Sequence, residues 1–188
     1  MSEPNSRFLL VGLGNPGPKY ADTRHNAGFL VLDRLVGDHG GSWEAQVKYQ
    51  GIIGKVPLCG KSFICLKPQT YMNRSGVSVR AVVDYFKIPE DRVIVLFDDI
   101  DVPAEKVKCR KGGGHGGHNG IRSLIEQGGL KDFYRIKLGL GRPPEPWDPA
   151  DWLLSGLSKA ESEALMGSMI PEVLLRVQQI LDQSQKKV

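Results

Sequence analysis

Apolar residues recur along this chain in two patterns, short runs with a period of two and longer stretches at helical spacing. The runs predict strands over residues 8–11, 46–58, 61–67, 92–97, 106–110 and 133–140. The helical spacing predicts helices over residues 29–36, 79–86, 121–125 and 158–181. Strands that alternate with helices, together with a hairpin around residues 57–60, indicate a single-domain three-layer α/β/α fold with a central mixed, mostly parallel twisted sheet.

Three local signals refine this pattern. The run 92–97 is apolar throughout, which is typical of a central strand buried on both faces. Ser158 and Glu161 form a capping-box signature at the start of the last helical stretch. Pro171 lies inside that stretch, and we expect it to kink or split the helix because proline removes a backbone donor.

Length and composition fit one domain that spans residues 1–188. Hydrophobic residues make up 40% of the chain, enough for a sizeable core, and the formal net charge of +4 favours a polyanionic partner. Three scattered cysteines without metal or redox spacing indicate reduced thiols. Residues 1–6 lack signal-peptide character, and no apolar run reaches membrane-spanning length. We therefore expect a cytoplasmic monomer without a membrane partner.

A long polar turn from Gly12 to Asn26 separates the first strand from the first helix. Gly12, Gly14 and Gly17 satisfy the dinucleotide fingerprint Gly-x-Gly-x-x-Gly, which would make the chain a nucleotide-dependent oxidoreductase. The fingerprint requires a helix that opens at the glycines and an acidic residue about 20 positions on. Here the helical pattern begins only near Asn26, and Asp33 lies inside the helix. A tight turn explains the glycines more simply.

Polar side chains gather in four loops, at residues 12–26, 68–75, 98–103 and 112–120. These loops supply Asn15, Tyr20, His25, Asn73, Asp98, His118 and Asn119. In an α/β sheet, loops of this kind can converge on one rim, where ligands bind. A His beside a carboxylate is the minimum for a general base, because the carboxylate fixes the tautomer and stabilises the imidazolium. Asn side chains can hold a carbonyl and its developing oxyanion.

Other chemistries lack their signatures. There is no Gly-x-Ser-x-Gly elbow, no Cys beside a His and no Gly-Lys-Ser/Thr phosphate loop, so neither a covalent nucleophile nor a P-loop is indicated. His115 and His118 are three residues apart without a neighbouring third ligand, so we expect no zinc site. Asp98, Asp99 and Asp101 lack the spacing of an EF-hand, so as a set they indicate a solvated strand end.

Basic residues alternate along the predicted strands 106–110 and 133–140. A period of two places such residues on one face of each strand, where they could contact phosphates in a salt-sensitive, sequence-independent way. For Lys106 alone, a solvated outer face is the simpler interpretation. The whole set favours an RNA-binding face, and it comprises Lys108, Arg110, Lys111, Arg135 and Lys137.

The motifs also form one ordered series that spans most of the chain. Its stretches are GLGNPG at 12–17, Tyr20, TRHNAG at 23–28, KP at 67–68, TYMN at 70–73, SG at 75–76, DDID at 98–101 and GGGHGGHNG at 112–120. In these stretches the chain resembles the bacterial-type peptidyl-tRNA hydrolases, and jointly they are highly specific. The length of 188 residues fits a single-domain member.

The resemblance implies hydrolysis of the ester that joins a peptide to the 3′ ribose of tRNA, a reaction that recycles stalled peptidyl-tRNA. By motif match, His25 would be the base that activates water, and Asp98 would orient it. Asn15 and Asn119 would position the substrate carbonyl and the attacking water. No metal and no organic cofactor is implied.

The resemblance also implies two binding regions. The residues that would line the peptide side of the site are Tyr20, Met72, Asn73 and His118. The residues in regions that the family uses for tRNA phosphates are Lys108, Arg110, Arg135 and Lys137. The partner expected from this resemblance is tRNA.

Two features depart from the family pattern. Relatives often have Arg at the position of Lys137, and a Lys cannot make the bidentate phosphate contact of an Arg. The segment 142–149, with prolines at 143, 144 and 146, is unusual and is followed by Asp151 and Trp152, in the region of the family's mobile gate. Neither departure touches the expected catalytic set.

A non-catalytic RNA-binding protein on the same scaffold is the alternative interpretation. The intact set of Asn15, His25, Asp98 and Asn119 argues against it. The absence of a transit segment in the sequence also argues against it, because the relative of this kind is a plant organellar splicing factor.

Overall fold

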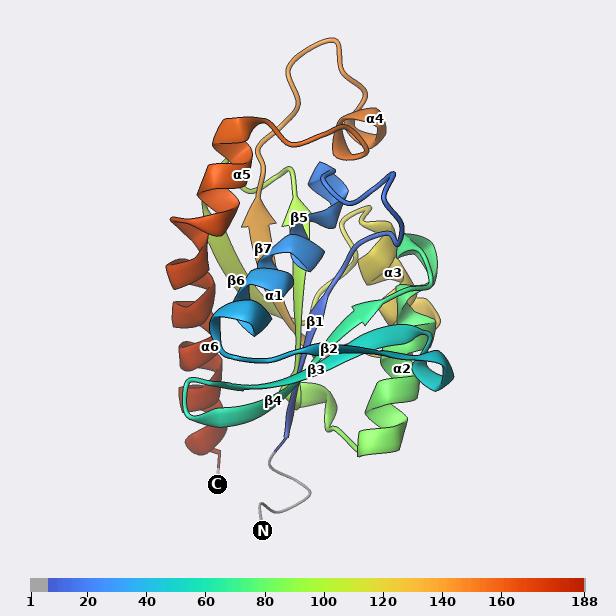
Figure 1. Cartoon of the computed structure of the whole chain (residues 1–188), viewed down its shortest axis with the longest axis vertical. Helices are drawn as coiled ribbons and strands as arrows, with labels where there is room; N and C mark the ends of the chain where they lie inside the picture. Colours follow the sequence, from blue (N-terminus) through green and yellow to red (C-terminus); the bar gives the residue numbers. More distant parts are fainter. Residues whose placement is uncertain (1–6, 188) are drawn as a thin grey trace.

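The structure, a computed structural model, describes residues 7–187, which build one seven-stranded sheet covered by helices (Figure 1). The polar segment 1–6 lies outside the described residues. The strands are β1 (Phe8–Gly12), β2 (Trp43–Gln46), β3 (Gly51–Leu58), β4 (Lys61–Pro68), β5 (Val93–Asp99), β6 (Val107–Lys111) and β7 (Tyr134–Gly139). They lie in the order β2-β3-β4-β1-β5-β7-β6.

The centre of the sheet is parallel and its margins are antiparallel. Strand β1 pairs in parallel with β4 and β5, and β5 pairs in parallel with β7. The antiparallel pairs are β2 with β3, β3 with β4, and β6 with β7. The predicted mixed sheet is thus confirmed, and the parallel strands end at one edge.

Helices cover both faces of the sheet and make the predicted three layers (Figure 1). The helices are α1 (Ala27–Asp38), α2 (Ser75–Phe86), α3 (Asn119–Glu126), α4 (Pro149–Leu153), α5 (Lys159–Met166) and α6 (Met169–Gln185). One buried cluster joins the sheet to α1, α5 and α6, and a second joins it to α2 and α3. Successive β1 residues alternate between them, with Leu10 in the first cluster and Leu9 in the second.

Strand β5 is buried from Val93 to Asp98, as predicted for a central strand. Its neighbours β1 and β7 lie on either side of it. Within the described residues, no helix has the length and apolar character needed to span a membrane.

The predicted strand 46–58 is wrong in one respect, because it is divided into two strands. Residues Val47–Tyr49 form a 3-10 helix, and Gln50 follows in the left-handed conformation with φ 49°. This turn folds β2 back on β3, so that Ala45 lies opposite Ile52. The apolar alternation does not reveal the turn, since it continues on both sides.

The C-terminal stretch is split, as the proline predicts, but the break lies before Pro171. The helix α5 ends at Met166, and Pro171 falls in the first turn of α6, where a missing backbone donor is tolerated. The capping box of Ser158 and Glu161 is confirmed. The short helix α4 was not predicted, although Asp148 caps it and Pro149 opens it.

The glycines of the polar turn bring β1 and α1 close together. A side chain at Gly12 would place its Cβ 2.5 Å from the carbonyl oxygen of Gly28, and one at Gly14 would strike the ring of Phe29. A Cβ at Gly28 would overlap the carbonyl oxygen of Leu96 on β5. Gly12 and Gly14 therefore serve packing, whereas Gly17, with φ 98° and no atom within 4 Å of a Cβ, serves the turn. The helix α1 opens well beyond these glycines, as the sequence predicts.

This packing predicts a difference between two glycines of the same helix. We expect Gly28→Ala to lower the free energy of unfolding by about 1–3 kcal/mol, because the methyl group forces α1 away from the sheet. Gly37→Ala on the same helix meets no atom within 4 Å, so it should be neutral or stabilise by up to about 1 kcal/mol. Urea unfolding of both variants measures this, and equal stabilities would contradict it.

Candidate active site

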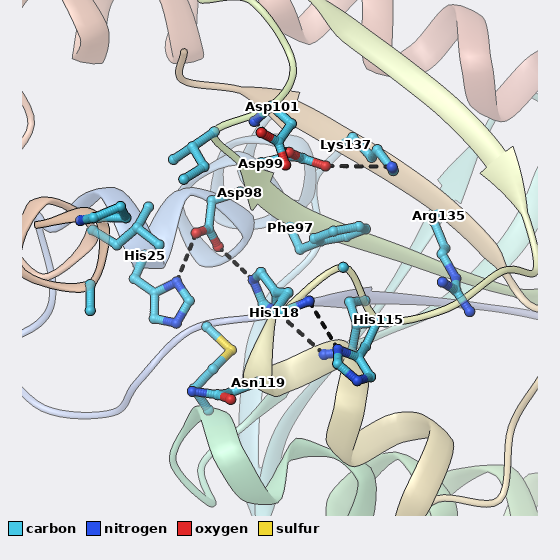
Figure 2. Close-up of a pocket in the computed structure, with 18 of the residues that line it drawn as sticks. His25, Phe97, Asp98, Asp99, Asp101, His115, His118, Asn119, Arg135 and Lys137 are labelled. Carbon is cyan, nitrogen blue, oxygen red and sulfur yellow. Dashed lines mark hydrogen bonds and ion pairs between the residues drawn. The ribbon is translucent and has the colours of Figure 1, made fainter. Parts of the chain in front are cut away.

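The carboxyl ends of the parallel strands open into a cavity of about 810 Å³ (Figure 2). The cavity brings together most of the side chains that the sequence singles out. The expected residues that line it are Asn15, His25, Met72, Asn73, Asp98, Arg110, His118, Asn119, Arg135 and Lys137. Tyr20 and Lys108 are not among its lining residues.

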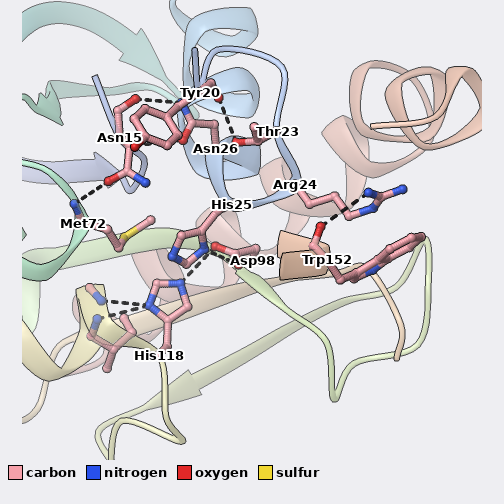
Figure 3. Close-up of polar contacts among 12 residues, drawn as sticks. Asn15, Tyr20, Thr23, Arg24, His25, Asn26, Met72, Asp98, His118 and Trp152 are labelled. Atoms are coloured by element: carbon pink, nitrogen blue, oxygen red, sulfur yellow. Dashed lines mark hydrogen bonds and ion pairs between the residues drawn. The ribbon is translucent and has the colours of Figure 1, made fainter. Parts of the chain in front are cut away.

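Asp98 is the centre of this site. It follows the buried run of β5, and its side chain is only 1% exposed. Its two oxygens meet two imidazoles: Oδ2 lies 2.7 Å from Nδ1 of His25, and Oδ1 lies 2.9 Å from Nε2 of His118 (Figures 2 and 3). A buried charge is tolerated when it is paired in this way, so the carboxylate and both rings form one unit.

His118 also caps the helix α3. Its Nδ1 accepts hydrogen bonds from the backbone N–H groups of Gly120 at 3.1 Å and Ile121 at 3.3 Å. An accepting Nδ1 carries no hydrogen, so Nε2 carries the proton and donates to Asp98. The cap thus fixes both the ring and its tautomer.

The environment sets the ionisation of Asp98 and His25. Burial opposes the charge on Asp98, but His25 and His118 beside it outweigh burial and hold the pKa of the carboxyl well below its usual range. Burial alone would lower the pKa of His25, but the charge of Asp98 and the hydrogen bond to it raise this pKa above 6.5. Asp98 therefore stabilises an imidazolium at His25.

The ring of His25 has one nitrogen, Nε2, that can accept a proton. Nδ1 donates to the carboxylate, so the neutral ring has its lone pair on Nε2. Nε2 has no hydrogen-bond partner among residues 7–187, and His25 lines the cavity. This arrangement is what a general base requires: one nitrogen held by a carboxylate and the other available to a proton.

His25, Asp98 and His118 have ligand atoms within 4.8 Å of one another, which is a spacing that a metal ion could use. The hydrogen bonds of His118 disfavour this use. A metal on Nε2 would place the ring proton on Nδ1, where it would face the N–H groups of Gly120 and Ile121. Metal-bound His normally donates this proton to an acceptor, so the cluster fits proton transfer better than metal binding.

Asn15 is buried and its amide is oriented by its neighbours (Figure 3). Its Oδ1 accepts the N–H of Met72 at 2.7 Å. Its backbone N–H and carbonyl are both bound by the side chain of Asn26, at 2.8 and 2.9 Å. With Oδ1 occupied, Nδ2 is the group of Asn15 that remains as a donor to the cavity.

Met72 reaches Asn15 through an unusual backbone conformation at the preceding residue. Tyr71 has φ 62° and ψ 157°, a region that non-glycine residues rarely adopt. Tyr71 is 55% exposed, and its ring lies edge-on to that of Tyr20, with centroids 6.4 Å apart. Tyr20 thus supports the neighbouring turn, and Thr23 Oγ1 donates to its carbonyl at 2.8 Å.

Asn73 and Asn119 are exposed at the mouth of the cavity. Asn119 is the first residue of α3, and its Oδ1 accepts from Arg122 at 3.4 Å. Gly120 beside it lets the helix approach the site, because a Cβ there would lie 2.6 Å from Sδ of Met72.

The basic residues lie in opposed pairs across β6 and β7. Lys108 is directly opposite Lys137, and Arg110 is directly opposite Arg135. Like charges in such positions repel, although Lys137 also pairs with Asp99 at 3.5 Å. Lys108 and Arg110 are exposed, as predicted.

The structure corrects the expected exposure of Arg135. The alternation places it on the predicted face, but the glycine-rich loop folds over it and leaves it 2% exposed. Its guanidinium donates to the carbonyl oxygens of Gly113, at 2.6 Å, and Gly114. Burial first, and the charge of Arg110 second, lower the pKa of Arg135. Arg135 therefore holds the loop beside His115 and is covered from solvent.

Sequence reasoning missed residues that hold the site without touching the cavity. Asn26 lies in a recognised motif, but its bonds to Asn15 have no local signal in the sequence. Arg24 is buried and pairs with Glu161, for which the sequence indicated only a role in capping. These partners are distant along the chain, and periodicity cannot report them.

Known proteins resemble this chain over most of its length. The family model described as peptidyl-tRNA hydrolase matches residues 9–188. The peptidyl-tRNA hydrolase of Exiguobacterium sibiricum is 46% identical over 156 residues, covering 83% of this chain and 84% of the relative. That of Geobacter sulfurreducens is 48% identical over 153 residues, covering 81% of this chain and 78% of the relative.

Solved structures show the same fold. The crystal structure of peptidyl-tRNA hydrolase from Acinetobacter baumannii has a TM-score of 0.86 and 33% sequence identity. The match covers 100% of this chain and 94% of that one. The family indicated by the motifs is therefore confirmed, and this chain belongs to the peptidyl-tRNA hydrolase family.

Proposed function

We propose that this protein hydrolyses the ester of peptidyl-tRNA, with His25 as the general base that activates water. Family membership supports the substrate and the ester bond that is cleaved. One observation carries the assignment of the base. His25 donates from Nδ1 to the buried Asp98 at 2.7 Å, which leaves Nε2 as an acceptor at the cavity.

The chemistry follows from this pair. Nε2 of His25 takes a proton from water while the water oxygen attacks the ester carbonyl. Asp98 stabilises the resulting imidazolium and does not itself take the proton. The imidazolium then protonates the departing 3′ oxygen of the ribose, so that free peptide and free tRNA leave and His25 is neutral again.

The amide of Asn15 supports this reaction at the carbonyl. Its Oδ1 is occupied by Met72, so Nδ2 is the donor for the oxyanion that develops on the carbonyl oxygen. Asn119 at the mouth would position the water, and Asn73 would hold the peptide main chain. Both ring nitrogens of His118 are already bound, so His118 would act by orienting Asp98. No cofactor takes part in these steps.

The opposed basic pairs support a tRNA-binding face. Lys108, Arg110 and Lys137 place cations across from like charges, and a phosphate above them would relieve the repulsion. Arg135 acts here by holding the glycine-rich loop. The monomeric state and cytoplasmic location stay predictions from the sequence.

The test of the base is His25→Asn, assayed on an N-blocked aminoacyl-tRNA beside the same tRNA with a free amino group. The wild type should cleave the blocked substrate alone. The variant should lose kcat by about 10²–10⁴-fold, because the proton acceptor is gone, while tRNA affinity is kept. A wild type that binds tRNA without cleaving it would favour the non-catalytic RNA-binding protein.

The pKa of His25 predicts the pH dependence. Because this pKa is raised above 6.5, kcat/KM should fall as pH drops through a midpoint above 6.5, where His25 gains its proton. Asp98→Asn removes the charge that raises the pKa and leaves burial, which lowers it. The midpoint of the NMR titration of the His25 ring should therefore move to lower pH in the variant. An unchanged midpoint would show that Asp98 does not raise the pKa of His25.

The basic face predicts a specific salt dependence. Arg110→Gln should reduce the slope of log affinity against log salt by roughly one, and should raise KM more than it lowers kcat. Lys106→Gln is the matched control, since Lys106 is exposed but precedes β6. Equal slopes in the wild type and in Arg110→Gln would place the tRNA elsewhere.

A further inference from the structure

The side chain of Arg24 is buried next to the catalytic residue His25 and is held by residues far along the chain (Figure 3). Nη2 donates to Oε1 of Glu161 at 2.6 Å, and Nε donates to Oε2 at 2.8 Å. The guanidinium also lies over the ring of Trp152, 3.4 Å from its centroid. A bidentate ion pair combined with stacking is the contact for which an Arg is preferred over a Lys.

Backbone bonds join the same two segments. The N–H of Arg24 donates to the carbonyl of Ser155 at 3.1 Å, and the N–H of Leu157 donates to that of Asp22 at 2.9 Å. Thr23 forms an isolated β-bridge with Gly156. The segment that carries α4 is therefore docked directly on the residues before His25.

This docking also builds a wall of the cavity. Ala150 and Leu153 of α4 line it together with His25 and Asp98. The cavity is therefore lined by apolar side chains where α4 borders it and by an ionised carboxylate at Asp98. Arg24 is thus the chain neighbour of His25, and its side chain contacts Trp152 of the helix that lines the cavity.

His25 lies between two buried anchors. It is the middle residue of the 3-10 helix Arg24–Asn26, in which Arg24 is 5% exposed and Asn26 is 2% exposed. Asn26 fixes one side of this turn to Asn15, at 2.8 and 2.9 Å. Arg24 fixes the other side to α4 and α5. The turn that carries His25 is thus held on both sides, and His25 itself contacts Asp98 at 2.7 Å.

We propose that Arg24 is a positioning residue for His25. Its ion pair with Glu161 and its stacking on Trp152 hold the turn so that Nδ1 of His25 meets Asp98 while Nε2 faces substrate. The inference rests on the proposed function, in which His25 is the base. It assigns Glu161 two roles, because the same carboxylate accepts the N–H of Ser158 in the capping box.

The burial of the ion pair makes the effect large enough to measure. Glu161 is one-fifth exposed and Arg24 is nearly covered, so solvent cannot replace a lost partner at the guanidinium. Burial opposes the charge on Glu161, but Arg24 and the Ser158 bonds outweigh it and lower the pKa of this carboxyl. The pair is therefore ionised wherever His25 works as a base.

The test measures kcat, KM and the NMR signal of the His25 Nδ1–H in the full-length protein. Arg24→Gln should lower kcat by on the order of 10–100-fold while KM changes less than about threefold, because the base is displaced and the binding face is untouched. The Nδ1–H signal should broaden or move. Glu161→Gln should act in the same direction, and Arg24→Lys should recover part of kcat by restoring the charge.

The control is Arg34→Gln on α1, which removes an exposed ion pair with Asp38 and should leave kcat and the signal unchanged. If Arg24→Gln does not fold, Glu161→Gln and Trp152→Phe carry the same test. A lowered melting temperature with kcat and the signal unchanged would make Arg24 merely structural. A raised KM with unchanged kcat would move its role to substrate binding through α4. Either result overturns the proposal.

The NMR signal separates this inference from the proposed function. If His25→Asn kept full hydrolysis, His25 would not be the base, whatever Arg24 does. The response of the Nδ1–H signal to Arg24→Gln would still report whether Arg24 sets the position of the ring.

Discussion

The structure depends on one buried negative charge. Asp98 lies at the end of a central strand, almost without solvent, and an unpaired carboxylate in such a place would not stay ionised. Both of its oxygens are therefore bound, by rings that come from segments 73 and 20 residues away. Asp98 can stay ionised only where those segments converge, so the residues that build the site also specify the fold.

The chain meets this condition with small residues and fixed turns. Gly28 allows α1 to contact β5, and Gly120 allows α3 to approach Met72. The backbone at Tyr71 adopts a rare conformation to deliver one N–H to Asn15. Arg24 and Glu161 repeat the principle with a second, partly buried pair of charges, which joins α5 to the turn that carries His25. Buried charges here specify geometry, since their partners must be in place for the fold to tolerate them.

Sequence reasoning predicted what local chemistry encodes. The apolar run 92–97 predicted a buried strand with Asp98 at its end, and the parallel pairing of β1 with β5 brings the loop of His25 to it. His118 follows the antiparallel strand β6, so parallel strands do not account for its contact with Asp98. Sequence reasoning could not predict that Arg135 is covered, because alternation assigns a face to a residue without showing what lies above it. It could not pair Arg24 with Glu161, since a contact across 137 residues leaves no periodic trace. The turn at Gln50 was missed because apolar residues continue on both sides.

Under the proposed mechanism, the pair of His25 and Asp98 has opposite consequences for folding and for turnover. A His whose pKa is raised on folding stabilises the native state fully below its unfolded value of 6.5, and this contribution is lost as pH rises through the folded pKa. The depressed pKa of Asp98 adds stability above 3.8, which is lost in stronger acid. The pair therefore contributes most to the native state between these values, where His25 already holds its proton and cannot accept another. If His25 is the base, as proposed, the rise in pH that removes its proton and lets it act also removes part of the stability of the native state. The enzyme would then work at a pH where this pair stabilises the fold less.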